Sequence, residues 1–254
     1  MDSTSTNCRD PTRCIAIQPL VLHGDELQSI GQSSLKMLMM KDSQTQNGLL
    51  IECRSYPENA NVEHLKSAVS LVARILAAAG SEARSIHVLQ AVGYVHLPHP
   101  TREFQMVLKY LPNMDSPRTL RDALMSGLPS INARLELCKQ VATAAFYTHT
   151  SVLVHKSIRP EAILLFQETG NVQAPPEAQE SVSRHPGSRL PDAIGIPFLI
   201  GFGLAREDTP DAFSSISRNI DWDRNIYTHP ARHVPGTRYT MRTTCTHLEL
   251  NYWK

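Results

Sequence analysis

Residues 131–150 carry a helical pattern that leads without a break into a short polar loop and then into a strand pattern that ends near residue 166. Apolar or small residues recur there at steps of three and four, which is the spacing of one helical face. The residues that we predict to share this face are Ile131, Leu135, Cys138, Ala142 and Ala145. A helix that passes its chain directly into a strand favours a mixed α and β domain.

The loop itself reads VLVHKSIRPEAILLF, at residues 152–166. Apolar runs brace it on both sides, and Pro160 restricts the backbone between them. Ser157 and Ala162 lie at its centre, where a loop built for chemistry would place groups that accept a proton or hold a metal. The loop is therefore predicted to be well held but poor in reactive groups.

The first half of the chain alternates strand patterns with a single helical pattern. A helix is predicted at 61–80, because apolar residues recur there at helical spacing up to Gly80. Strands are predicted for the short apolar runs at 15–22, 35–40, 48–53, 86–97 and 104–111, which are separated by clusters of turn residues. The predicted fold class is α+β, with a small β-rich part containing one helix, followed by a helical part.

Two segments are excluded from the predicted core. Residues 1–14 are rich in Ser, Thr, Asn and Asp and are expected to form a disordered tail. Residues 167–193 are dense in Pro, Ser, Gln and Glu with few large apolar side chains, and are expected to be a mobile insertion. A further strand pattern, GIPFLIGFGLAR, follows at 195–206.

Charge and composition exclude several classes of function. The 254 residues contain 25 Lys and Arg against 24 Asp and Glu, which gives no electrostatic reason to expect nucleic acid as a partner. Five widely spaced cysteines and an N-terminus without the apolar core of a signal peptide favour a cytoplasmic location. No apolar run approaches the roughly 18 residues of a membrane span, so we expect no membrane segment.

The loop and the later strand pattern together resemble the protein kinase-like superfamily. Kinase loops read H-R-D-L-K-P-E-N and their metal-binding turns read D-F-G, and the corresponding residues here are His155, Lys156, Ser157, Ile158, Arg159, Pro160, Glu161 and Ala162, then Gly201, Phe202 and Gly203. NIYTHPARH and RYTM, at 225–233 and 238–241, are similar to segments of divergent fungal kinase-like domains, which are often fused to prion-inhibition or HeLo-type domains.

This resemblance implies a bilobal fold. The β-rich N-lobe is expected at 15–112 and a partial helical C-lobe at 113–241. Residues 242–254, with the sequence RTTCTHLELNYWK, do not continue the family pattern and are expected to be an atypical tail. We expect a C-terminally truncated lobe, with the apolar undersides of 131–166 and 198–204 exposed as a result.

The resemblance also implies that the reaction groups are missing. The aspartate that accepts the substrate proton is replaced by Ser157, and the two metal-ligand positions are taken by Ala162 and Gly201. None of these three residues supplies a carboxylate, so no catalytic residue is expected to be intact and no metal site is expected. His155 and Phe202 match positions that pack between the two lobes.

Nucleotide binding is expected to be absent or weak. HGDELQSIGQSS at 23–34 has only Gly24 and Gly31, too far apart for a glycine-rich phosphate loop. Arg54 stands near the position of the phosphate-binding lysine, where it is a candidate phosphate contact, although a surface arginine is the more common case. We therefore expect no resident cofactor and at most weak binding of ATP with Mg²⁺.

Three functions follow as hypotheses. The first is a catalytically impaired kinase-like domain, a pseudokinase, that acts as a binding or signalling module for a protein partner. The second is a divergent active serine/threonine kinase that recruits another acid, such as Glu161, Glu207 or Asp208. The third is a truncated fragment without function. The oligomeric state is left open.

Two further patterns have competing interpretations. Lys156 and Arg159 would suit a phosphorylated or acidic partner, or would simply form a solvated or locally paired basic loop. His229 and His233 have the spacing of a helical metal pair, but Pro230 lies between them and no third ligand is evident, which disfavours zinc.

Overall fold

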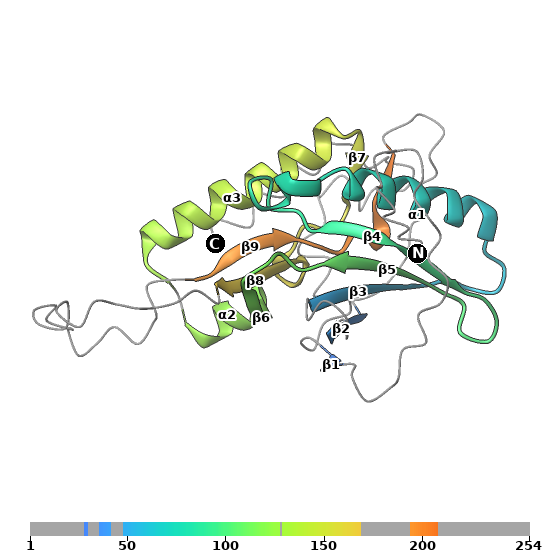
Figure 1. Cartoon of the computed structure of the whole chain (residues 1–254), viewed down its shortest axis with the longest axis horizontal. Helices are drawn as coiled ribbons and strands as arrows, with labels where there is room; N and C mark the ends of the chain where they lie inside the picture. Colours follow the sequence, from blue (N-terminus) through green and yellow to red (C-terminus); the bar gives the residue numbers. More distant parts are fainter. Residues whose placement is uncertain (1–27, 30–35, 42–47, 128, 169–193, 208–254) are drawn as a thin grey trace, which may run out of the picture.

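The computed structural model describes residues 28–29, 36–41, 48–127, 129–168 and 194–207 of the chain (Figure 1). These residues form small antiparallel sheets and three α-helices, in the order of a mixed α+β protein. The predicted fold class is confirmed at this level. The predicted tail at 1–14, the patterns at 225–241 with His229 and His233, and the predicted atypical tail at 242–254 lie outside the described residues.

The largest sheet has five antiparallel strands in the order β1-β2-β3-β5-β4. Its strands are β1 (Gln28–Ser29), β2 (Lys36–Lys41), β3 (Gly48–Ser55), β4 (Gln90–Leu97) and β5 (Glu103–Lys109). Four of the five predicted strand runs are found here, and the fifth, at 15–22, lies outside the described residues. The first residue of β3 is Gly48, and glycine fits there because a Cβ would come within 2.1 Å of the Tyr110 ring.

Helix α1 (Val62–Ala77) lies across the sheet over β4 (Figure 1). Its N-cap is Asn61, whose side chain accepts a hydrogen bond of 3.0 Å from the His64 amide. The predicted apolar face is buried at Val69, Val72, and Leu76. Gly80, at φ 46°, begins the 3₁₀ segment η2 (Gly80–Arg84), so the helix ends slightly before the predicted stop.

The second part of the fold is built on a three-stranded sheet, β6-β8-β9. In chain order, the elements of this second part are β6 (Met114–Thr119), α2 (Leu120–Ser126), α3 (Ile131–Thr150), β7 (Leu153–Val154), η3 (Pro160–Ala162), β8 (Ile163–Glu168), β9 (Ile196–Leu199), η4 (Phe202–Leu204) and β10 (Arg206–Glu207). Strand β10 pairs with β7 as a separate two-stranded ladder. Helix α3 packs on β9 and on β7 and lies on the same side of the molecule as α1 (Figure 1).

The bounds of α3 agree with the predicted helix, but its predicted face is wrong. The side chains that α3 buries are Leu137, Val141, Ala144, Ala145 and Thr148. Of the predicted face only Ala145 is buried, and Ile131 and Leu135 are 66% and 57% exposed. Both sides of the helix carry apolar residues, and the row with Leu137, Val141 and Ala144 is the one that faces inward, where α3 packs on β9 and β7.

Two other expectations change in detail. The segment excluded from the core begins two residues too early, because Gln167 and Glu168 complete β8. The expected exposure of 131–166 and 198–204 is found on the outer side of α3, where Phe146 is 70% exposed, but not in β8 and β9, where Phe166 and Phe198 are fully buried. Within the described part of the chain, no helix combines the length and the apolar character needed to cross a bilayer.

Candidate functional site

The loop at 155–162 and the turn at 201–203 lie side by side, because β8 and β9 pair directly behind them. Ile163 stands opposite Leu199 in that ladder. Beyond the ladder, the Ile200 amide donates to the Ala162 carbonyl over 2.9 Å. The two segments that carry the sequence resemblance are therefore brought together, although about 40 residues separate them along the chain.

His155 links the loop to the turn and is completely buried. Its Nδ1 accepts from the Ser157 amide over 3.4 Å, which leaves Nε2 to carry the hydrogen and donate to the Ile200 carbonyl over 2.9 Å. The ring meets Phe202 edge to face, with centroids 4.7 Å apart. Burial lowers the pKa of His155 to about 4, so the ring is neutral at physiological pH and serves packing rather than proton transfer.

Glu52, in the middle of β3, is the side chain that binds the turn. Its Oε1 accepts from the Gly201 amide over 2.7 Å, and its Oε2 accepts from the Phe202 amide over 3.0 Å. Gly201 has φ 85°, in the left-handed region that glycine adopts without strain, and this conformation directs both amides toward β3. Burial of the carboxyl raises the pKa of Glu52 to about 7, although the backbone hydrogen bonds oppose that shift.

Arg54 follows Glu52 by two positions and so lies on the same side of β3. A Cβ placed on Gly203 would lie 3.6 Å from the Arg54 Cβ, so the arginine stem runs beside the turn. Burial lowers the pKa of Arg54. Arg54 therefore lies beside the turn, where its predicted role as a phosphate contact stays a prediction, and the carboxyl that accepts from the turn amides is that of Glu52.

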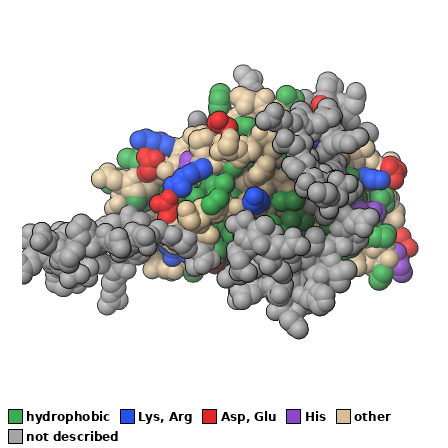
Figure 2. All heavy atoms as spheres, viewed as in Figure 1, with side chains coloured by type: hydrophobic (Ala, Val, Ile, Leu, Met, Phe, Trp, Pro, Cys, Tyr) green, Lys and Arg blue, Asp and Glu red, His purple; other side chains and the backbone are tan. Residues whose placement is uncertain are grey.

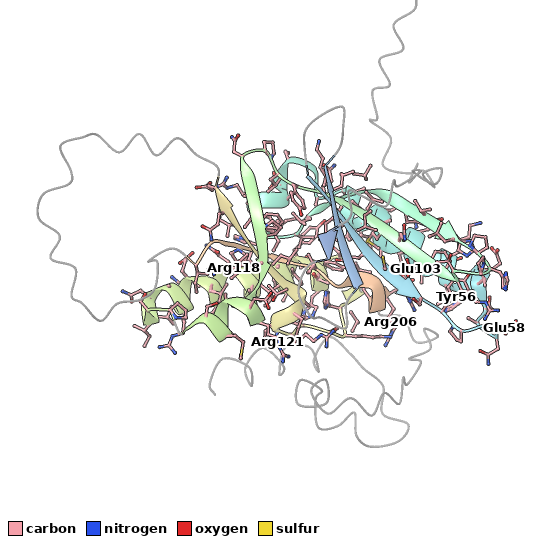
Figure 3. All side chains as sticks on the ribbon, turned by 90° about the horizontal axis from the view of Figure 1, so that it is seen from below. Tyr56, Glu58, Glu103, Arg118, Arg121 and Arg206 are labelled. Atoms are coloured by element: carbon pink, nitrogen blue, oxygen red, sulfur yellow. The ribbon has the colours of Figure 1, made fainter. Side chains whose placement is uncertain are left out.

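Glu161, the second acid of the site, is held by two arginines. Arg121 on α2 donates from Nη1 to Oε1 over 2.6 Å, and the Arg159 Nε lies 3.9 Å from Oε2. Both Glu161 and Arg159 are almost completely buried. Figure 3 shows Arg121 and Arg118 on the α2 side of the molecule, away from Glu103, Tyr56 and Glu58. The contact with Arg121 fastens this end of the loop to α2.

The remaining loop residues carry little chemistry. Ser157 is half-buried and its amide contributes to the His155 contact. Ala162 is completely buried in η3, and its side chain offers a methyl group and no metal-ligand atom. Lys156 takes a left-handed backbone conformation, at φ 62°, between His155 and Ser157. The loop residues and the turn residues therefore meet in space, and the acid among them, Glu161, is paired with Arg121.

The residues that the structure describes around the turn do not offer the ligand set that magnesium with ATP would need. Magnesium prefers carboxylate and other hard oxygen ligands in an octahedral array. Among the described residues, no three Asp, Glu, His or Cys side chains lie together in a way that would hold a metal ion. The carboxylate nearest the turn, that of Glu52, is bound to the Gly201 and Phe202 amides. A negative charge there would also repel a phosphate group that approached the same amides.

Glu52 was missed by the sequence reasoning, which concentrated on Arg54. The available signal was a charged residue in the centre of GLLIEC, an otherwise apolar strand pattern. A buried charge requires a partner or an altered pKa, so its position alone marks it as unusual. The identity of the partner had no sequence signal, because the turn lies 149 residues further along the chain.

Comparison with known proteins assigns no relationship: no protein-family model matches the chain, and no curated protein matches it.

Proposed function

We propose that this chain is a catalytically impaired protein kinase-like domain, a pseudokinase of the divergent fungal type, that acts by binding a protein partner. In this proposal the five-stranded sheet with α1 is the small lobe, and the part built from α2, α3 and β6 to β10 is an incomplete helical lobe. The order of the elements supports this correspondence, as does the contact between His155 and Phe202 at their junction.

The observation that carries the proposal is the contact of Glu52 with the turn. A domain that transfers phosphate needs cations and metal ligands around the phosphate groups. Here a buried carboxyl takes up the Gly201 and Phe202 amides instead. Ser157 and Ala162 add neither a general base nor a ligand, and a positioned general base alone contributes about 10² to 10⁴ in rate.

The alternative of an active kinase with a recruited acid is less well supported. Of the three acids considered, Glu161 is engaged with Arg121 and Arg159. Glu207 is exposed on β10, and Asp208 lies outside the described residues. The Oε1 of Glu161 already accepts a hydrogen bond from Arg121 on α2 over 2.6 Å, which ties this carboxyl to α2.

A protein partner is supported by the character of the surface. Figure 2 shows cationic and anionic side chains interspersed on one face of the described residues, which does not favour a polyanion such as nucleic acid. The outer side of α3 exposes three large apolar side chains, those of Ile131, Leu135 and Phe146. Apolar groups gathered on one helix face are typical of surfaces that bind other proteins.

Phosphotransfer from γ-labelled ATP to the chain itself and to a generic protein substrate tests the proposal. The assay uses the whole chain at high concentration with Mg²⁺ or Mn²⁺, and the Ser157→Ala variant is the matched control. We expect the wild-type chain and the control to give the same background signal. Transfer that depends on the metal and disappears in Glu161→Gln, Glu207→Gln or Asp208→Asn would support the active kinase instead.

Thermal unfolding of the same preparation separates the third hypothesis. A binding module requires a folded domain, so we expect one cooperative transition whose midpoint does not shift with ATP and Mg²⁺. A chain that unfolds without any cooperative transition would be a fragment, and the proposed function would be withdrawn.

A further inference from the structure

Exposed apolar side chains gather along α3, which lies at the outside of the molecule (Figure 1). Six large hydrophobic side chains among the described residues are exposed, and five of them lie between residues 125 and 152. These five are Met125, Ile131, Leu135, Phe146 and Val152, and the sixth is Val92 on β4. Apolar surface that is concentrated in this way on one element indicates an interaction surface.

One row of α3, which we call the α3 stripe, consists of Ile131, Leu135, Ala142 and Phe146. These residues are exposed and follow one another at steps of four, seven and four, so they share one helical face. At 1.5 Å per residue the α3 stripe is about 22 Å long. Cys138, a free cysteine that is half-buried, lies near its middle. The buried face of the helix is a separate one, made of Leu137, Val141, Ala144, Ala145 and Thr148.

We propose that two copies of this chain pair through the α3 stripe, with the two helices antiparallel and Cys138 near the two-fold axis. The inference rests on the proposed function, because it names the partner that the outer side of α3 binds. A two-fold contact requires a surface that is complementary to itself. Ile131 lies seven residues before Cys138 and Phe146 lies eight residues after it, so an antiparallel pair brings Ile131 against the partner's Phe146. In the same way the large side chain of Leu135 meets the small side chain of the partner's Ala142.

The charges beside the α3 stripe also fit a second copy. Glu136 and Lys139 lie on one flank of the stripe, one before and one after Cys138, and their side chains are exposed. Within one chain the Lys139 Nζ is 3.6 Å from the Glu136 Oε2. Because the second helix runs in the opposite direction, Glu136 of one copy comes beside the partner's Lys139, and Lys139 comes beside the partner's Glu136. The antiparallel direction also opposes the two helix dipoles, which is favourable.

The size of the surface predicts a weak and reversible pair. A stable interface buries about 800 Å² on each partner, whereas the α3 stripe is about four turns of a single helix. The net charge of +1 gives the two copies little electrostatic repulsion. We therefore expect a dissociation constant of roughly 10 to 100 μM.

Sedimentation equilibrium of the whole chain at concentrations from about 5 to about 500 μM tests the pair. We expect the average mass to rise from that of one chain toward that of two chains and to level off there, because a two-fold contact closes after two copies. A mass that stays at that of one chain up to about 500 μM would overturn the inference. A mass that continues to rise beyond two chains would overturn it as well.

Leu135→Glu and Val92→Glu give the matched comparison. Both replace an apolar side chain that is about half exposed, at 57% and 49%, so neither change reaches the core. Leu135→Glu would bury a charge against the partner's Ala142 and should weaken the pair by at least about tenfold. Val92→Glu lies on β4 and should leave the association unchanged. Association of Leu135→Glu equal to that of the wild-type chain would contradict the inference, and the wild-type result decides the matter if a variant fails to fold.

Cross-linking of thiols distinguishes the antiparallel pair from a parallel one. A short bismaleimide should join two wild-type chains at Cys138, as peptide mass spectrometry would identify, and should not do so in Cys138→Ser. In the Cys138→Ser background, Ile131→Cys should be joined to Phe146→Cys when the two variants are mixed. Dimers linked through Ile131→Cys alone would contradict the antiparallel arrangement, because the two Ile131 positions lie at opposite ends of the pair.

The outcomes also separate this inference from the proposed function. A chain that remains folded, transfers no phosphate and stays monomeric would end the inference and leave the proposed function in place. Metal-dependent phosphotransfer by a chain that dimerises would end the proposed function and leave the pair in place.

Discussion

Glu52 and His155 are buried on opposite sides of the same turn, and burial shifts their titration in opposite senses. The pKa of Glu52 is raised to about 7, so its contribution to stability is complete below its unfolded value of 4.5 and is lost as the pH rises through about 7. The pKa of His155 is lowered to about 4, so its contribution is present above the unfolded value of 6.5 and is lost as the pH falls through about 4.

These two dependences oppose each other between about pH 4.5 and pH 6.5. In that window each contributes a slope of about 1.4 kcal/mol per pH unit, with opposite sign, so their sum is nearly flat. We predict that Glu52→Gln unmasks His155, and that its free energy of unfolding rises by roughly 2 to 3 kcal/mol across the window relative to the wild-type chain. Urea denaturation at several pH values measures this difference. A Glu52→Gln curve parallel to that of the wild-type chain would show that Glu52 does not titrate in the folded protein as described.

Among the elements, two phenylalanines differ widely in how much of the side chain is exposed to solvent. Phe202 in η4 is 2% exposed and contacts His155, whereas Phe146 on α3 is 70% exposed. The same residue type thus offers a matched pair of substitutions. Substitution of Phe202 removes a ring that fills the space between β3 and the loop. Substitution of Phe146 removes a ring that mostly faces solvent.

We predict that Phe202→Ala lowers the free energy of unfolding by roughly 3 to 5 kcal/mol, because it leaves a cavity and removes the edge-to-face contact with His155. Phe146→Ala should change it by less than about 1 kcal/mol, as expected for an exposed position. Chemical denaturation of the two variants under one set of conditions checks both values. Equal losses in the two variants would mean that the outer side of α3 is covered in the folded chain.

Local patterns were sufficient to predict most elements. Helices α1 and α3 and strands β2 to β5 follow from the spacing of apolar residues and from turn residues at their ends, since these are local signals. The face of α3 could not be predicted in the same way. Its apolar residues form two competing rows, and the choice between them depends on β9, which joins the sheet only after a long intervening segment.

The candidate site was predictable in its loop and turn but not in its central contact. By resemblance, His155 and Phe202 were matched to positions that pack between two lobes, and in the structure their two rings meet edge to face. The acceptor of the turn amides was not expected, because an acid on β3 and a glycine at 201 carry no mutual signal in one sequence. Contacts of this kind depend on how the sheet and the turn come together in three dimensions, which the spacing of residues along the chain does not encode.

The whole chain has 25 basic and 24 acidic residues, and charges of both signs are interspersed on the face shown in Figure 2. This balance does not favour a polyanionic partner. Between β3 and the turn at 201–203, a buried carboxyl accepts two backbone amides. Glu52 binds the turn amides, and Arg54 lies beside Gly203 without forming a phosphate site by itself. We therefore predict a protein that keeps the packing between the loop, the turn and β3 and does not bind ATP with Mg²⁺ there.

Calorimetric titration of the whole chain with ATP in the presence of Mg²⁺ tests that claim most directly. We expect no saturable heat for the wild-type chain, because the described residues around the turn form no group of metal ligands and Glu52 takes up the turn amides. Saturable binding that requires Mg²⁺ and is weakened in Arg54→Ala would contradict the account, since it would make the junction a working nucleotide site.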